Sequence, residues 1–168
     1  MIDYLDYCIK CATKGVIFDT NVLLVFLIGL WDAKVISKFN RTSSYTEDDF
    51  ELLLLIANKV GRIVITPHIL TEACNLSDTL NKKHGYRIYE VITMMLKDTK
   101  ERRQEAIRLT ADPLFNYLGI ADMSLIDASK RHHLIVTDDL MCATTINDSG
   151  GLAININNLR GTDWLGYR

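Results

Sequence analysis

The chain has 168 residues, a length that fits one domain, and 48% of them are apolar, which is enough for a full core. The formal net charge of −2 excludes a protein that coats nucleic acid through overall positive charge, so nucleic-acid binding would need a local basic patch. The N-terminus carries acids where a secretory leader has basic residues, and the longest apolar run, residues 22–31, is about half a membrane span. We therefore expect a cytoplasmic protein without a membrane partner.

Short apolar runs that are typical of buried parallel strands alternate with helical segments along the chain. The first expected elements are a helix over residues 2–12, a strand over residues 14–19 and an apolar helix from Thr20. They are followed by a helix that Thr46 opens and Gly61 ends, a strand over 63–65, a helix over 67–78, a helix that carries Asp122, and strands over 134–136 and 152–156. This order predicts an α/β fold in three layers (an α/β/α sandwich), with a mainly parallel central sheet of four to five strands.

Two segments are interpreted as additions to a single domain, 1–168, whose core spans about 14–158. Residues 32–46 are polar and basic, and we expect them to form an excursion from the core. Residues 80–110 mix apolar positions with many charges, and we expect a helical insertion that Gly85 divides.

Four acidic residues stand where a strand ends or where a helix should be buried. Asp19 ends the first strand, Asp139 follows the strand over 134–136, and these are positions where parallel sheets carry functional groups. Glu72 shares the apolar face of its helix, and Asp122 opens a helix after a glycine. A buried carboxylate is costly unless a cation or hydrogen bonds compensate it. The four acids therefore predict a shared divalent cation, and oxygen ligands favour Mg²⁺.

Each acid also has a structural alternative. Asp19 is a candidate N-cap, although Thr20 or Asn21 would cap the next helix equally well. For Glu72 the alternative is an ion pair with a Lys or Arg. Asp127, five residues after Asp122, is rotated by about 140° on an ideal helix, so we expect it to face solvent or pair with Arg131.

The acids Asp138 and Asp139 directly follow a strand, so one is expected to be a ligand and the other a cap. Thr137 is expected to orient a carboxylate or a bound water. The four cysteines include one C-x2-C pair, Cys8 and Cys11, without a second pair at zinc-site spacing. Reduced thiols in the core explain them better than a zinc site does.

Taken in order, these motifs resemble those of the PIN domain family, whose members are metal-dependent nucleases that mostly cut single-stranded RNA. The motifs stand here as VIFDTN with Asp19, HILTEACNL with Glu72, GIADMSLIDAS with Asp122 and LIVTDD with Asp139. Each motif is weak alone, but the four together cover nearly the whole chain. The spacing from Asp122 to Thr137 is slightly shorter than the commonest family pattern, which leaves Asp127 as a substitute.

The resemblance implies that one or two Mg²⁺ or Mn²⁺ ions are held by the four acids Asp19, Glu72, Asp122 and Asp139. It implies that the site is supported by Thr20, Asn21, Thr137 and Asp138. The expected activity is hydrolysis of phosphodiester bonds in single-stranded or structured RNA. A toxin of a toxin–antitoxin pair, held by an antitoxin-type protein inhibitor, is one expected role, although the chain is longer than the family's small toxins.

Candidate contacts with RNA phosphates are the basic residues Lys82, Lys83, Arg87 and Arg41. Their alternative is a solvated helix face with interspersed acids. The apolar stretch from Ile88 to Leu96 is a candidate homodimer interface, and burial within one copy explains it equally well.

Two other functions remain open. The fold would also suit a non-catalytic module that binds RNA or protein, with the acids kept for stability or occupied by a partner's arginines. A haloacid-dehalogenase-like phosphatase is the weaker alternative, because that family needs a second Asp where this chain has Asn21.

Overall fold

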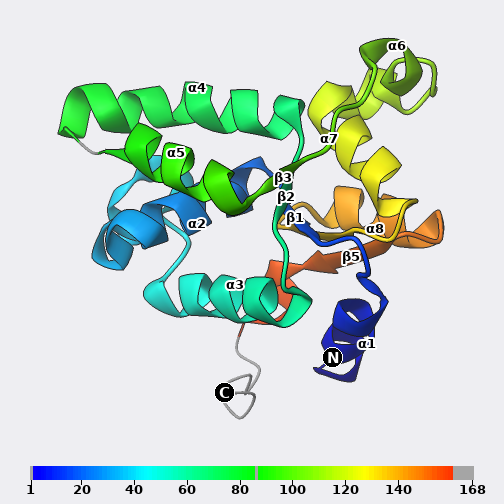
Figure 1. The fold of residues 1–168 in the computed structure, drawn as a ribbon, viewed down its shortest axis with the longest axis horizontal. Coiled ribbons are helices and arrows are strands. Elements are labelled where there is room, and N and C mark those ends of the chain that lie inside the picture. Colours follow the sequence, from blue (N-terminus) through cyan, green and yellow to red (C-terminus); the bar gives the residue numbers. More distant parts are fainter. Residues whose placement is uncertain (1, 86, 161–168) are drawn as a thin grey trace.

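The computed structural model describes residues 2–85 and 87–160 as an α/β fold (Figure 1). The strands in this part of the chain are β1 (Val16–Phe18), β2 (Val64–Ile65), β3 (Lys100–Glu101), β4 (Leu134–Thr137) and β5 (Leu152–Asn155). The α-helices are α1 (Ile2–Cys11), α2 (Thr20–Asp32), α3 (Glu47–Val60), α4 (Pro67–His84), α5 (Ile88–Asp98), α6 (Ala106–Leu109), α7 (Phe115–Ser129) and α8 (Leu140–Asp148). The 3₁₀ helices are η1 (Ala33–Lys38), η2 (Asn40–Thr42) and η3 (Ile156–Asn158).

All five strands are parallel, but they form two sheets rather than the single sheet that we expected. One sheet has the order β1-β4-β5, with Ile17 opposite Ile135 and Ile135 opposite Ala153. β2 and β3 form the other sheet, and an isolated bridge between Val16 and Ile63 links the two. β2 and β3 have two residues each, and they pair at two positions. The α/β class and the parallel strands are thus confirmed, whereas one sheet of four to five strands is not.

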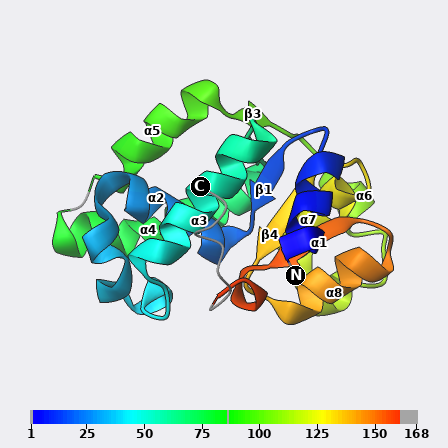
Figure 2. The same ribbon diagram turned by 90° about the horizontal axis from the view of Figure 1, so that it is seen from below.

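Helix α2 is the most apolar helix of the core. Its residues from Val22 to Ile28 are 3% exposed or less, and it packs against α3, α4 and α5. The segment Thr20–Lys38 is long and apolar enough to cross a membrane, but burial inside the protein already explains its composition. Figure 2 shows α2 and α3 on one side of β1 and β4, and α1 and α7 on the other.

Residues 32–46 fold back onto the core instead of forming the expected excursion. The segment contains η1 and η2, and its side chains Val35, Ile36 and Tyr45 are buried. The Thr42 hydroxyl donates a hydrogen bond to the Ile36 carbonyl at 2.6 Å. Exposed polar residues stand among its buried apolar residues, so the polar composition of the segment did not indicate which positions are buried.

The insertion over 80–110 is helical in part. Gly85 ends α4 with a φ of 66°, which confirms the predicted division. Strand β3 was not predicted, because Lys100 and Glu101 are exposed and pair with β2 through backbone groups alone. In α5, Ile88 and neighbouring apolar residues are buried within the monomer, while Met94 is 59% exposed.

The cysteines are all free thiols, and Cys8 and Cys142 are buried as small core residues. Helix α7 is broken at Gly119, which has a φ of 78° and a ψ of 177°. The second part of α7 therefore begins after Gly119 and carries Asp122 in its first turn. This break places a carboxylate at a new helix start, where the backbone N–H groups favour negative charge.

Candidate acidic site

Asp19 ends β1 and at the same time begins α2. Its backbone N–H donates to the Val136 carbonyl at 3.0 Å, which extends the contact between β1 and β4. Its Oδ1 accepts the Val22 N–H at 3.2 Å, so Asp19 itself is the N-cap that the alternative foresaw. Its Oδ2 accepts a hydrogen bond from the Thr137 hydroxyl, as predicted for Thr137. Asp19 thus caps α2 and also lies at the carboxyl end of β1.

The Asp19 carboxylate is buried, and no basic side chain in the described part of the chain compensates its charge. Burial raises the pKa of Asp19 to about 7, against the lowering effect of the Thr137 hydroxyl, and the charge of Asp138 raises it further. Among the described residues, no Lys or Arg forms an ion pair with Asp19. A bound cation would therefore stabilise the ionised form of this group.

Asp122 is partly buried and lies close to other acids. Burial raises the pKa of Asp122 to about 6, and the charges of Asp139 and Glu72 raise it further. The charges of two other predicted acids thus act on Asp122. Burial raises the pKa of the Cys142 thiol, and the charges of Asp122, Asp19 and Asp139 raise it further.

Glu72 is solvent-exposed, which corrects the prediction that it lies on the buried face of its helix. Its neighbours Ile69 and Ala73 are buried, so Glu72 stands at the edge of the apolar stripe rather than inside it. Its Oε2 accepts a hydrogen bond from the Thr20 hydroxyl at 2.8 Å. This contact brings Glu72 to the start of α2, next to Asp19. The alternative of an ion pair with Lys or Arg is not seen in the described ranges.

Asp139, which was the favoured fourth ligand, is exposed and caps a helix. Its Oδ1 accepts the N–H groups of Met141 at 2.6 Å and Cys142 at 3.0 Å at the start of α8. The Thr137 oxygen accepts the Asp139 N–H at 2.9 Å. Asp139 therefore has the role of the cap, while its charge still acts on Asp122.

Asp138 contacts the start of α2. Its two carboxylate oxygens each lie 3.4 Å from the side-chain amide of Asn21, which donates to them. Its negative charge acts on Asp19. Three of the four predicted supporting residues contact an acid: Thr20 contacts Glu72, Asn21 contacts Asp138 and Thr137 contacts Asp19. The fourth, Asp138, is itself an acid.

Asp127 does not belong to this group of acids. Its Oδ2 accepts hydrogen bonds from Arg102 at 2.7 Å and from Gln104 at 3.0 Å, and not from Arg131, the expected partner. Burial acts to raise the pKa of Asp127, but the bonds from Arg102 and Gln104 outweigh it and hold the pKa below its usual value. Asp127 is therefore a structural carboxylate, as its position on the helix predicts.

The donor chemistry of the site fits Mg²⁺ or Mn²⁺. The predicted ligands offer carboxylate oxygens, and within the described ranges no Lys or Arg pairs with Asp19 or Asp122. In residues 2–85 and 87–160, however, no three His, Cys, Asp or Glu side chains lie close enough together to hold a metal ion. Mg²⁺ keeps several water ligands, so a site of this kind needs few direct protein contacts.

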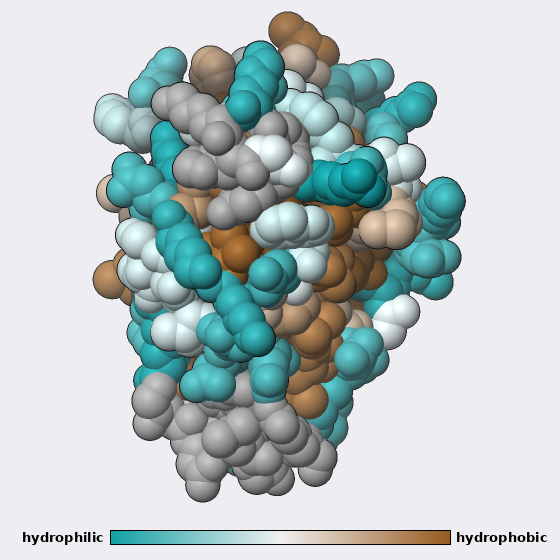
Figure 3. All heavy atoms as spheres, turned by 90° about the vertical axis from the view of Figure 1, so that its left-hand side faces the viewer, coloured by the Kyte–Doolittle hydropathy of each residue, from teal (hydrophilic) through white to brown (hydrophobic). Residues whose placement is uncertain are grey.

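Lys82, one of the candidate RNA contacts, lies away from the acids. Lys82 pairs with Asp78 at 2.6 Å and Arg87 with Glu90 at 3.5 Å, which favours the solvated helix face. Lys82 is ten residues after Glu72 on α4, roughly 15 Å along the helix axis. The Lys83 side chain lies outside the described residues, and Arg41 is exposed on η2. Figure 3 shows that this end of the molecule is mostly hydrophilic, with an apolar strip.

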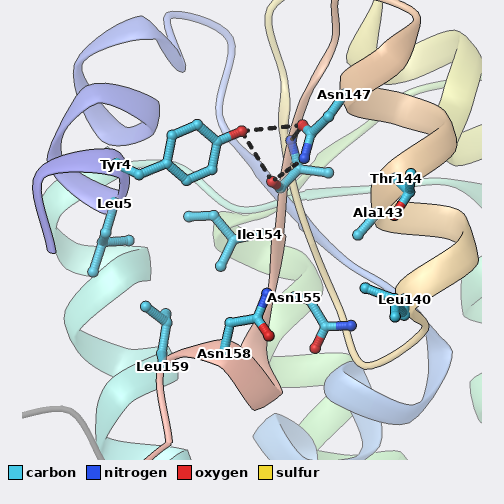
Figure 4. Close-up of a pocket in the computed structure, with 11 residues that line it drawn as sticks. Tyr4, Leu5, Leu140, Ala143, Thr144, Asn147, Ile154, Asn155, Asn158 and Leu159 are labelled. Atoms are coloured by element: carbon cyan, nitrogen blue, oxygen red, sulfur yellow. Dashed lines mark hydrogen bonds between the residues drawn. The ribbon is translucent and has the colours of Figure 1, made fainter. Parts of the chain in front are cut away.

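A pocket of about 130 Å³ lies between α1, α8 and β5 (Figure 4), and none of the four acids lines it. The Asn147 amide fills part of its wall by donating to the Ala153 carbonyl at 3.1 Å and accepting the Ala153 N–H at 2.9 Å. The Tyr4 hydroxyl donates to Asn147 at 3.1 Å. These bonds cover the open edge of β5, so the pocket has a structural explanation.

Tyr45, whose pKa is raised by burial and further by Asp138 and Asp19, and Arg160 were not identified from the sequence as site residues. Tyr45 is buried, and Arg160 lies over its ring at 4.4 Å. They are more than a hundred positions apart in the chain, so no local pattern joins them. No protein-family model, no characterised protein and no solved structure matches this chain. The function must therefore be inferred from the residues and their geometry.

Proposed function

We propose that the protein is a metal-dependent endoribonuclease that hydrolyses phosphodiester bonds in single-stranded or structured RNA. The observation that supports this most is that burial and neighbouring acids raise the pKa of Asp19 and Asp122, while no Lys or Arg of the described residues pairs with either carboxylate. Acids in this state bind a divalent cation readily. When bound, such an ion neutralises the phosphodiester and lowers the pKa of a coordinated water.

The protein's own residues would hold and orient this centre. Asp19, Glu72, Asp122 and Asp139 are the proposed ligands of one or two Mg²⁺ or Mn²⁺ ions. The Thr137 hydroxyl fixes the rotation of the Asp19 carboxylate, and the Thr20 hydroxyl does the same for Glu72. Such supporting contacts restrict the ligands before the ion arrives.

The resemblance to the PIN domain family extends this proposal to the fold. Its three-layer α/β/α sandwich requires one parallel sheet, and the bridge between Val16 and Ile63 supports a connection between the two small sheets. On the same resemblance we propose that the protein acts in the cytoplasm as a toxin, that an antitoxin-type protein inhibits it, and that two copies pair.

Cleavage of a mixed single-stranded RNA pool tests the function directly. The purified protein is incubated with Mn²⁺ or Mg²⁺ and, in parallel, with EDTA, alongside Asp19→Asn and Asp127→Asn. Both variants replace one aspartate by its isosteric amide, but only Asp19 lies among the acids. We expect metal-dependent cutting that Asp19→Asn abolishes and Asp127→Asn retains. Cutting that survives Asp19→Asn would point to a contaminant or to another site.

A non-catalytic module that binds RNA or protein is the second candidate. It is favoured by the fact that Asp19 and Asp139 both cap helices, a role that needs no metal. A folded protein that cuts no RNA of the pool under any metal condition, but binds it, would favour this function.

A further inference from the structure

A second pocket, of about 220 Å³, lies where the segment that joins β3 to α6 runs beside α7 (Figure 1). Its walls come from this segment, from α6 and from the C-terminal end of α7, and α6 packs against α7. The charged residues that line it are four arginines and two acids, namely Arg102, Arg103, Arg108, Arg131, Glu105 and Asp127. This arginine pocket therefore carries local positive charge, although the net charge of the whole chain is −2.

Arg102 is the least exposed of the three arginines that form ion pairs here. Its side chain is 19% exposed, and its Nη2 donates to Asp127 Oδ2 at 2.7 Å. Its Nε is buried and has no hydrogen-bond partner among the described residues. Because buried donors are normally paired, Arg102 has one donor more than the protein itself uses. This part of the pocket wall therefore favours an acceptor, such as an anion.

The other three arginines are exposed, and their charge is available to a ligand. Arg103 pairs with Glu101 at 2.8 Å and Arg108 with Glu105 at 3.0 Å. Arg131 pairs with no acid in the described ranges. Exposed ion pairs contribute little free energy, so an anionic group that several guanidinium groups contact at once can displace the two glutamates.

The size and the lining of the arginine pocket indicate the class of ligand. Pockets for drug-sized ligands have volumes of about 300–1,000 Å³, so this smaller one suits a small anionic group better than a whole nucleotide. None of the described residues that line it is aromatic, so a base finds no ring on which to stack. The planar guanidinium group matches the oxygens of a phosphate, which is the small anion that RNA carries at every nucleotide.

The arginine pocket lies within reach of an RNA strand that is bound at the acidic site. Asp122 and Arg131 are nine residues apart, which corresponds to roughly 13 Å of helical rise along α7. Phosphates of one strand in a duplex are spaced by about 3.4 Å along the helix axis. A strand of several nucleotides is therefore long enough to contact both places.

We propose that the arginine pocket binds a backbone phosphate of single-stranded RNA, several nucleotides away from the bond that is cut. The position relative to a cut bond rests on the proposed nuclease function. The binding of the RNA phosphate does not, because it needs neither metal nor catalysis.

RNA binding in EDTA tests the pocket without the metal. The anisotropy of a labelled single-stranded RNA is measured at several salt concentrations with the wild type, Arg108→Gln, Arg131→Gln and the control Arg87→Gln. Arg87 and Arg108 are both exposed, and each pairs with a glutamate three positions away, so only the pocket distinguishes them. Arg131→Gln breaks no ion pair seen in the described ranges, and urea unfolding checks that each variant is folded.

We expect Arg108→Gln and Arg131→Gln each to weaken RNA binding about 10-fold, as loss of a charged hydrogen bond does. Each should also reduce the slope of log K against log salt by about 0.7, the share of one phosphate contact in a single strand. A purely structural role would leave that slope unchanged. If folded Arg108→Gln and Arg131→Gln bind RNA with the affinity and the slope of Arg87→Gln, the proposal is wrong.

Calorimetric titration with inorganic phosphate separates RNA from a free phosphate ligand. Saturable binding of inorganic phosphate that Arg131→Gln removes, combined with RNA binding that this variant retains, would overturn RNA as the ligand. A wild type that cuts no RNA with Mn²⁺ or Mg²⁺, but whose RNA binding in EDTA depends on Arg108 and Arg131, would remove the nuclease function and support the phosphate site. The two failures are therefore distinguishable.

Discussion

Helix α7 carries two aspartates, five residues apart, whose surroundings are opposite. Asp122 lies beside Asp139 and Glu72, and its pKa is raised to about 6, first by burial and then by these charges. Asp127 accepts hydrogen bonds from Arg102 and Gln104, and these hold its pKa below the usual value despite burial. The same residue type on one helix is thus uncompensated on one face and paired on the other.

The difference between these two faces separates a candidate functional group from a structural one. A paired carboxylate has its charge satisfied within the protein, so nothing further needs to bind. An uncompensated carboxylate among like charges gains free energy when a cation arrives. The Asp127 face of α7 therefore serves as an internal reference for every test of the Asp122 face.

The largest expected difference between the two faces is in catalysis. Asp122→Asn removes a proposed metal ligand, and we expect RNA cleavage with Mn²⁺ to fall on the order of 1000-fold. Asp127→Asn removes only the ion pair with Arg102, and the cleavage rate should stay near that of the wild type. Equal losses in initial-rate measurements would mean that the two faces do not differ in function.

The next largest expected difference between the two faces is in how much Mn²⁺ stabilises the protein against unfolding. Mn²⁺ at 100 times its dissociation constant should raise the free energy of unfolding by about 2.7 kcal/mol in the wild type. The gain should be retained in Asp127→Asn and largely lost in Asp122→Asn, as measured by urea unfolding with and without the ion. An equal gain in all three proteins would show that Mn²⁺ binds elsewhere.

The pH dependence of stability follows from the sign of each shift. Asp19 has a folded-state pKa of about 7, above its unfolded value, so its stabilising contribution is present at low pH and is lost as the pH rises through 7. In EDTA, we expect this group to lower the free energy of unfolding by about 2–3 kcal/mol between pH 5 and pH 8. Asp19→Asn should remove that slope. Asp127 should change the free energy of unfolding with pH in the opposite direction, because its pKa is lowered in the folded state. Its stabilising contribution is present at neutral pH and is lost as the pH falls through that lowered pKa.

The smallest effect is expected at the far end of α4. Lys82 and Arg87 are exposed and already paired with Asp78 and Glu90. Because exposed pairs contribute little and Lys82 is roughly 15 Å along the helix from Glu72, Lys82→Gln and Arg87→Gln should each change RNA cleavage by less than about 2-fold. A loss comparable to that of Asp122→Asn would instead place the path of the RNA across this end of the molecule.

Much of the fold was predictable because its cues are local. The apolar runs at β1, β2, β4 and β5 mark buried strands, and Gly85 marks the end of a helix. β3 carries no such cue, since its two residues are exposed and it exists only where its backbone meets β2. The buried positions in residues 32–46 were hidden by the polar residues around them.

The candidate site divides in the same way. The positions of Asp19, Asp122 and the pair Asp138 and Asp139 follow from strand ends and from a glycine before a helix. The helical period also separated Asp122 from Asp127 correctly. The exposure of Glu72 was not predicted, because the period places a residue on a face without saying whether it lies at the centre or at the edge of the buried stripe.

The sequence by itself determined the α/β class, the places of β1, β2, β4 and β5 and the candidate acids, because each depends on neighbours within a few residues. Only the tertiary structure decided which acid is paired, which is exposed and which caps a helix, because these depend on groups from distant segments. Arg102 contacts Asp127 from the insertion, Thr20 contacts Glu72 from another helix, and Arg160 contacts both Asp49 and the ring of Tyr45. Charge compensation is a property of three-dimensional distance, and one-dimensional spacing does not contain it.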